Sequence, residues 1–154
     1  MFIAIALLAE AAFEYSVQAD MMTDAKTHIA RIGVARGPSI VIACGAATDN
    51  QMVVNFKPGT PLDDFKGGIL LPFRNRIRFG DATPVEMEVE YLRDTIVITG
   101  SDAVAFTKAA MTSDQVVFEF KDYRETVRQM RLPLSGAADS ISQVEAGCGV
   151  IAKK

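Results

Sequence analysis

A chain of 154 residues has the usual size of one domain and is long enough to bury a hydrophobic core. Hydrophobic residues make up 49% of it and charged residues 23%, a globular composition that excludes a fully disordered protein. The net charge of −3 disfavours a nucleic-acid-binding protein. No apolar run reaches the roughly 18 residues that a transmembrane helix needs.

The N-terminal residues 1–12, MFIAIALLAEAA, are almost entirely apolar. The run ends in Ala9-Glu10-Ala11, which fits the small-x-small pattern of signal-peptide cleavage, although no basic residue precedes it. Two interpretations stay open: the remnant of a signal peptide, or an apolar arm packed on the domain. The first predicts a periplasmic or secreted protein, whereas a retained arm would allow a cytoplasmic or virion location. Residues 13–154 are predicted to form a single β-rich domain.

Short runs rich in apolar and β-branched residues predict four strands in the first third of the domain. These strands are expected at residues 13–17, 27–34, 39–44 and 52–56. Residues 57–68 hold many turn-forming residues and predict a long loop. This loop contains Asp63 and Asp64, which we consider part of a possible binding surface.

Residues 71–91 show the clearest alternation in the chain and predict a hairpin around the turn at 80–84. One strand carries arginines and the other glutamates at every second position, so opposite charges are expected to face each other. The expected pairs are Arg78 with Glu86, Arg76 with Glu88, and Arg74 with Glu90. A solvent-exposed charge ladder is the simpler interpretation, and an anion-binding arginine row is the functional one.

The remaining segment predicts a strand at 95–99, a helix at 102–112, strands at 115–120 and 126–134, and a closing helix. Ser101 and Ser135 are the expected N-caps of the two helices, and Ala138 is expected on the buried face of the second. The fold class predicted is mainly β, a β-sandwich or curled antiparallel sheet with a short inserted helix and a C-terminal helix.

No catalytic motif stands out. His28 is the only histidine and there is no CxxC, so a zinc site of ordinary composition is excluded, and we expect neither a metal nor a cofactor. Asp20 and Asp24 could touch a calcium ion, but turn capping explains them better because further oxygen ligands are missing. Catalysis by paired carboxylates stays an alternative, since proximity in space is not visible in sequence.

Cys44 ends a strand-like run and Cys148 lies at the end of the expected C-terminal helix. In an exported protein the two would form a disulfide, and the alternative is a pair of buried reduced thiols.

Several of these features together resemble a known family. They are Asp20-Met-Met-Thr-Asp24 after a strand, a strand ending at Cys44, a hairpin with Arg76-Ile-Arg78, and a closing helix that follows Leu132-Pro-Leu-Ser-Gly136 and ends in Cys148. Over residues 13–149 the chain is similar in spacing to the small periplasmic VasI/TagO-like proteins associated with type VI secretion and to related exported domains. The chain departs from that pattern in having no tryptophan, and in having Ala43 where a basic residue commonly precedes the first cysteine.

The resemblance implies an exported, non-enzymatic accessory domain and supports the Cys44–Cys148 disulfide. The function predicted is an interaction domain, not an enzyme, that binds another protein or an envelope component. Two alternatives are a structural component of a virion or multi-subunit assembly, and a small hydrolase that uses carboxylates.

Overall fold

The computed structural model describes residues 12–33, 37–62 and 73–149, so the expected N-terminal arm and the loop residues Asp63 and Asp64 lie outside the described residues. The elements in chain order are β1 (Glu14–Ala19), β2 (Lys26–Gly33), β3 (Ser39–Gly45), the 3₁₀ helix η1 (Ala46–Thr48), β4 (Val53–Lys57), β5 (Phe73–Phe79), β6 (Val85–Leu92), β7 (Thr95–Ile98), α1 (Gly100–Met111), β8 (Gln115–Lys121), β9 (Val127–Pro133) and α2 (Ala137–Cys148). The fold is mainly β with a short internal helix and a C-terminal helix, which confirms the predicted class.

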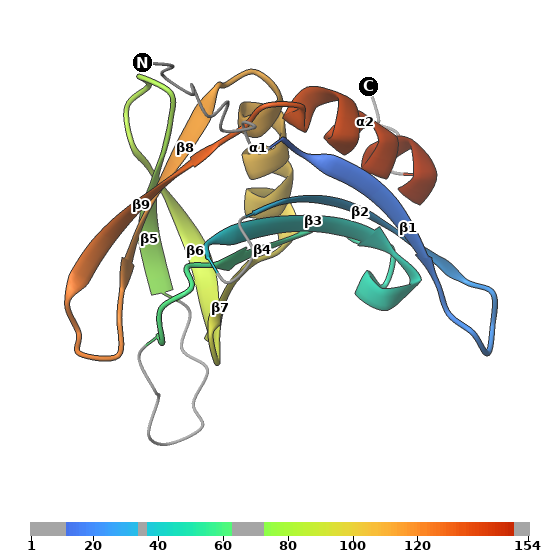
Figure 1. Cartoon of the computed structure of the whole chain (residues 1–154), viewed down its shortest axis with the longest axis horizontal. Helices are drawn as coiled ribbons and strands as arrows, with labels where there is room; N and C mark the ends of the chain where they lie inside the picture. Colours follow the sequence, from blue (N-terminus) through green and yellow to red (C-terminus); the bar gives the residue numbers. More distant parts are fainter. Residues whose placement is uncertain (1–11, 34–36, 63–72, 150–154) are drawn as a thin grey trace, which may run out of the picture.

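The strands that the structure describes form one antiparallel sheet in the order β1-β2-β3-β4-β7-β6-β5-β8-β9. The sheet is strongly curled. Strands β4 and β8 are four steps apart in the sheet order, yet the Phe56 ring on β4 stacks on Phe118 of β8 with centroids 3.9 Å apart. The observed form is therefore the curled sheet and not the sandwich. Both helices lie on the same side of the sheet, α2 along β1–β3 and α1 beside the curl (Figure 1).

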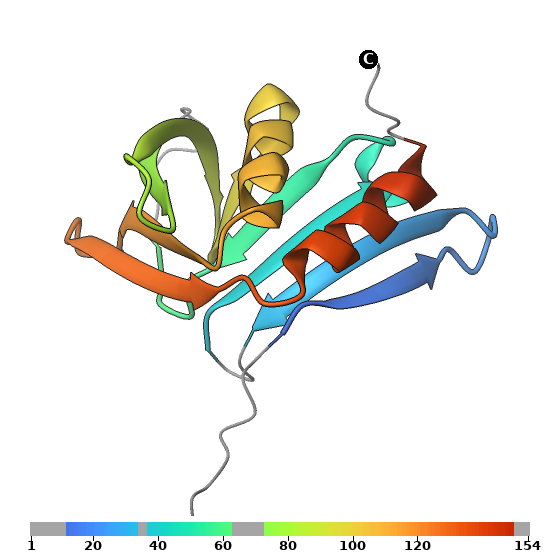
Figure 2. The ribbon, with the colours of Figure 1, turned by 90° about the horizontal axis from the view of Figure 1, so that it is seen from above.

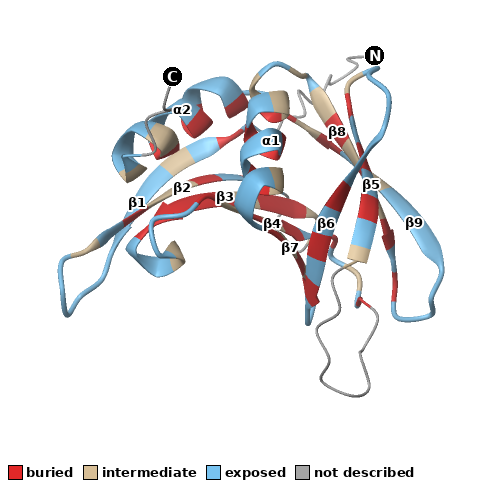
Figure 3. Ribbon diagram, turned by 180° about the vertical axis from the view of Figure 1, so that it is seen from behind, coloured by how far each residue is buried: buried red, intermediate tan, exposed pale blue. Residues whose placement is uncertain are grey.

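Alternation along each strand divides the sheet into two faces. Side chains toward the helices form the core, and those of β3 on this side, Ile40, Ile42 and Cys44, are fully buried. The helices turn their buried residues toward the sheet and their exposed ones outward (Figure 3). Ile141 and Val144 are buried, as expected, but Ala138 is exposed and Ala137 is buried in its place, so the expected inward position of Ala138 was wrong.

The expected helix caps were wrong in both cases. Thr99 occupies the N-cap of α1 and Gly136 that of α2, neither with a capping side-chain hydrogen bond. Gly136 has φ 75°, a left-handed conformation that an alanine or serine would adopt only with strain. The N-cap of α2 therefore lies one residue after the expected Ser135, and the helix begins at Ala137.

Cys44 of β3 and Cys148 at the end of α2 form a disulfide with their Cα atoms 5.5 Å apart. The bond confirms the predicted bridge and holds the last turn of α2 against the sheet. None of the helices described is both long and apolar enough to cross a membrane.

Residues 71–91 contain the predicted hairpin, but its register differs by two residues from the expected one. Arg76 lies opposite Glu86, and Arg74 opposite Glu88. Both charge rows are exposed on a shared face, as expected, because a shift of two residues leaves every side chain on its original side of the sheet.

Candidate binding surface

The outward face of β5, β8 and β9 carries a cluster of polar side chains. On β5 the buried side chains are Asn75, Ile77 and Phe79, so that the intervening Arg76 and Arg78 point to solvent. Strand β8 pairs with β5 on the side away from β6, which places the middle of β8 directly beside these arginines.

Arg76 binds Glu119 of β8 and does not pair with Glu88. Its Nε and Nη2 atoms donate to the two carboxylate oxygens at 2.9 and 2.8 Å, a bidentate geometry, and Gln129 of β9 donates a third hydrogen bond at 2.9 Å. The hydrogen bond from Arg76, followed by that from Gln129, lowers the pKa of Glu119, and the same bond raises the pKa of Arg76. Glu119 is thus an ionised carboxylate whose oxygens are occupied.

One cross-strand step away, Arg78 of β5 and Arg131 of β9 lie on either side of Val117 of β8. Arg78 approaches only the fully exposed Asp81, at 4.0 Å, and Arg131 has no ion pair among the described residues. A shallow cavity of about 240 Å³ covers this area. Its lining defines the arginine surface: Arg76, Arg78, Pro84, Val117, Glu119, Gln129 and Arg131. Three arginines against one glutamate make it locally positive on a protein of net charge −3.

The structure thus brings two of the three predicted arginines into one surface. Arg74 lies opposite Glu88 and does not line the cavity. Sequence reasoning missed Glu119, Gln129 and Arg131. The sequence signal that could have identified the two β9 residues is the alternation of this strand. Gln129 and Arg131 are exposed and Leu132 is buried, so the alternation predicts that Gln129 and Arg131 face outward. Only the pairing of β8 with β5 shows that these residues meet the arginines.

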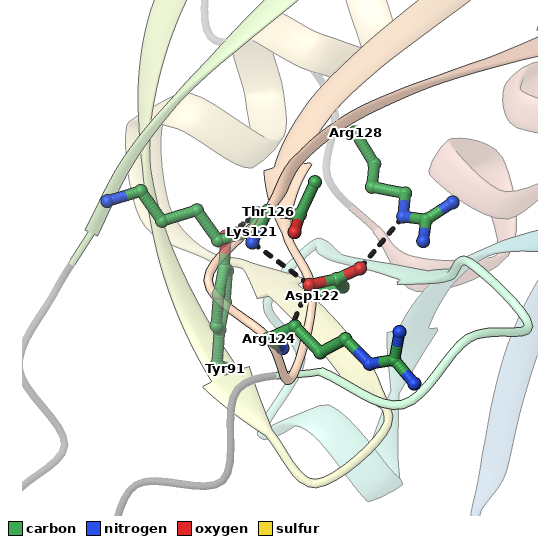
Figure 4. A network of polar contacts seen from close by, with 6 residues as sticks. All are labelled: Tyr91, Lys121, Asp122, Arg124, Thr126 and Arg128. Atoms are coloured by element: carbon green, nitrogen blue, oxygen red, sulfur yellow. Dashed lines mark hydrogen bonds and ion pairs between the residues drawn. The ribbon is translucent and has the colours of Figure 1, made fainter.

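A second polar cluster lies at the β8–β9 turn and surrounds the carboxylate of Asp122, whose side chain is 0% exposed (Figure 4). One oxygen accepts the backbone N–H groups of Arg124 and Thr126 at 2.9 and 3.0 Å, and the other accepts Nε of Arg128 at 2.8 Å. The Arg128 hydrogen bond is the largest influence and lowers the pKa of Asp122 against the opposing effect of burial. A carboxylate whose partners all lie within six residues, in the turn and at the start of β9, holds that turn in shape.

His28 and the Asp20–Asp24 turn have structural partners. Nδ1 of His28 lies 2.6 Å from the Tyr15 hydroxyl, and its ring packs under Gly147 of α2. Asp20 accepts the backbone N–H groups of Met22 and Thr23 at 2.8 and 2.9 Å, which is the turn capping expected from the sequence. Within the described parts of the chain, no three His, Cys, Asp or Glu side chains lie close enough together to hold a metal ion.

Comparison with known proteins gives no relative: no family model, no curated protein and no solved structure matches this chain. The resemblance to VasI/TagO-like proteins therefore stays a prediction.

Proposed function

We propose that this protein is a non-enzymatic interaction domain whose arginine surface binds an acidic segment of another protein. The observation that carries the proposal is the pair Arg78 and Arg131, two guanidinium groups on either side of Val117. Arg78 has only the 4.0 Å contact with the fully exposed Asp81, and Arg131 has no ion pair with a described residue. Adjacent strands are about 4.8 Å apart, so these two arginines stand on strands roughly 10 Å apart. Two acidic side chains of one extended peptide can reach that far.

The composition of the surface favours binding over hydrolysis. Paired-carboxylate catalysis needs one carboxyl group that keeps its proton near neutral pH. Among the described residues Glu119 is the only carboxylate lining the cavity, and its contacts with Arg76 and Gln129 lower its pKa. Arginine forks suit carboxylates because they donate two parallel hydrogen bonds.

The Cys44–Cys148 bond supports an exported setting for this function. Disulfides persist in oxidising compartments and are rare where thiols are kept reduced. An exported accessory domain linked to an envelope or secretion assembly, as the family resemblance implies, would meet partner proteins there. We therefore propose a periplasmic or secreted location and a partner of protein nature.

A glutamate-rich peptide carrying a fluorescent label tests the proposal through its anisotropy. Wild-type protein should bind it, and the double variant Arg78→Glu and Arg131→Glu should bind at least about tenfold more weakly, a difference of about 1.4 kcal/mol. Affinity should also fall with added salt, because exposed charges are screened.

The matched control is the double variant Lys108→Glu and Arg124→Glu. It changes the net charge by the same amount, at exposed positions outside the arginine surface. It should bind as the wild type does. Equal loss in both double variants would mean that overall charge attracts the peptide, and no binding by the wild type would reject an acidic protein segment as the ligand.

A further inference from the structure

Strand β9 is one of the two edge strands of the described sheet. It is the last strand in the sheet order, and no described helix or strand lies along its outer side (Figure 2). An edge strand presents backbone N–H and C=O groups that have no partner within the sheet. Which residues of β9 present them follows from the hydrogen bonds between β8 and β9.

In an antiparallel ladder only every second residue pair exchanges hydrogen bonds, and the residues between these pairs direct their N–H and C=O groups away from the partner strand. The bonds between Asp122 and Thr126 and between Asp114 and Leu134 fix this alternation at the two ends of the β8–β9 ladder. The residues of β9 whose backbone groups point away from β8 are therefore Val127, Gln129 and Arg131. These groups, which we call the free edge, make no hydrogen bond with a described residue.

The free edge borders the arginine surface. The side chains of Val127, Gln129 and Arg131 are all exposed and share one face of β9, and the last two line the arginine surface. Val127, which is 57% exposed, continues the same row of side chains toward the turn. A strand added to the free edge would therefore place every second side chain next to the arginine surface.

We propose that the acidic segment of the partner binds as an additional antiparallel strand on the free edge of β9. This inference rests on the proposed function and states how the segment is held. Backbone hydrogen bonds supply affinity in complexes formed by strand addition, and side chains at alternate positions supply specificity. In an antiparallel pair, residues that exchange hydrogen bonds lie opposite each other and share a face. The segment would thus carry acidic residues at every second position, each bonded to β9 through its backbone and directed outward.

The register of the sheet extends to the added strand. Arg131, Val117 and Arg78 form one cross-strand row on β9, β8 and β5. A residue of the segment opposite Arg131 would continue that row. An acidic side chain at this position would lie beside Arg131, with Arg78 two strands further in, so both guanidinium groups would attract it.

Charge favours β9 over the other edge strand and favours an acidic strand over a second copy. Strand β9 reads VRQMRLP, with two arginines and no acidic residue, whereas β1 reads EYSVQA, with a glutamate and no basic residue. The start of β1 is also covered, because Phe13 donates its N–H to the carbonyl of Ser135. Pairing β9 with β9 of a second copy would bring two arginine surfaces together, which like-charge repulsion opposes.

Methylation of peptide amides tests the strand addition. The probe is a fluorescent peptide of alternating glutamate and valine, added to the whole chain. Methylation of its glutamate amides removes the N–H groups that would bond to the free edge, so binding should weaken by about tenfold or more. Methylation of the same number of valine amides is the matched control. That peptide should bind as the unmodified one does, because its valine N–H groups would point away from β9.

The outcomes separate this inference from the proposed function. Equal binding of the two methylated peptides would overturn strand addition and leave an acidic ligand standing. A greater loss from methylated valines would overturn the antiparallel arrangement. No binding by the unmodified peptide would overturn both the inference and the proposed function.

Amide hydrogen exchange tests the protein side of the contact. The N–H groups of Val127, Gln129 and Arg131 should exchange rapidly in the free chain and become protected with the unmodified peptide, whereas the β9 residues between them, bonded to β8, should change little. Attraction by charge alone would not protect these three amides. If they stay unprotected when the peptide is saturating, strand addition is overturned.

A proline at the free edge gives a second test. Gln129→Pro removes one outward N–H without removing a hydrogen bond to β8, and proline is tolerated at such positions of edge strands. Gln129→Ala is the matched control, because it loses the same side chain and keeps the N–H. The proline variant should bind the unmodified peptide about tenfold more weakly than the alanine variant. Thermal melts establish that both are folded, and equal binding by the two folded variants would contradict the proposal.

Discussion

Asp122 shows how one residue can organise a turn that carries exposed side chains. Its carboxylate accepts the N–H groups of Arg124 and Thr126, and its own N–H donates to the Thr126 carbonyl at 3.0 Å. The neighbouring Tyr123 donates its N–H to the carbonyl of Pro61 at 3.1 Å, which attaches this turn to the segment after β4. A buried aspartate is stable in this place because each oxygen has a donor.

The linkage between the Asp122 pKa and stability gives a pH-dependent prediction. Its pKa in the folded protein is below the ordinary value of 3.8, so its contribution is present above about pH 3.8 and is lost as the pH falls through the folded-state pKa. Asp122→Asn should lower the melting temperature by several degrees at neutral pH, because an amide N–H₂ would face the Arg128 donor. The difference from the wild type should shrink in acid.

Melting curves measured from neutral to acid pH check this, with Asp81→Asn as the control at a fully exposed carboxylate. If the melting temperature of Asp122→Asn stays below that of the wild type by a constant amount through the acid range, the stabilisation does not depend on the ionisation of Asp122. That result would contradict the stabilising role of the ionised carboxylate.

At the scale of elements, α2 is attached to the sheet by contacts at both of its ends. At its start, Ser140 donates to the carbonyl of Phe13 at 3.3 Å, and at its end Cys148 is bonded to Cys44. Between them Ile141 and Val144 are fully buried against the sheet. At Gly147 a side chain would collide with the His28 ring, so glycine is required there by the close approach of helix and strand.

Removal of this bridge should destabilise the whole domain. The disulfide closes a chain separation of 104 residues, and loops of that order are the ones for which cross-linking restricts the unfolded chain most. The double variant Cys44→Ala and Cys148→Ala should lose roughly 2–5 kcal/mol in the free energy of unfolding, measured by urea denaturation. A reducing agent should shift the wild-type midpoint in the same direction and leave the double variant unchanged. A wild type that is insensitive to reduction would argue against a stabilising bond.

For the molecule as a whole, aromatic rings join the two ends of the curl. Phe56 of β4 stacks on Phe118 of β8 and meets Phe120 edge-on at 5.8 Å, and Phe106 of α1 lies 5.7 Å from Phe118. These rings are fully or almost fully buried. A single core therefore serves strands that are four steps apart in the sheet order, and we expect these strands to unfold together.

Phe56→Ala tests that expectation. The loss of a large buried ring should cost about 3–5 kcal/mol, whereas Leu92→Ala at an exposed position should cost within about 0.5 kcal/mol. Hydrogen exchange should show β2–β4 and β5–β8 losing protection in one step in the Phe56 variant. Separate opening of the two groups of strands would mean that the rings do not couple them.

The sequence by itself determined the strands, the two helices and the side of the sheet on which most residues lie. Alternation is a local property with a period of two residues, so the outward position of Arg76 and Arg78 and the inward position of Ile77 follow from neighbours in the chain. The sequence predicted the disulfide only for an exported protein and left two reduced thiols as the alternative, and the structure shows the bond. The first residue of each helix was less predictable. The N-cap of α2 is Gly136 in a left-handed conformation, which depends on the path of the chain after β9 and not on a capping side chain.

Only the tertiary structure decided what those outward side chains meet. The charge rows of the hairpin repeat every two residues, so a shift by two gives an equally good pattern, and the turn that chooses between the registers is not encoded in the alternation. The bond from Arg76 to Glu119 joins residues 43 positions apart and depends on β8 pairing with β5, which the curl of the sheet permits. The arginine surface is made by that long-range pairing, because no local pattern specifies which strand becomes the neighbour of β5.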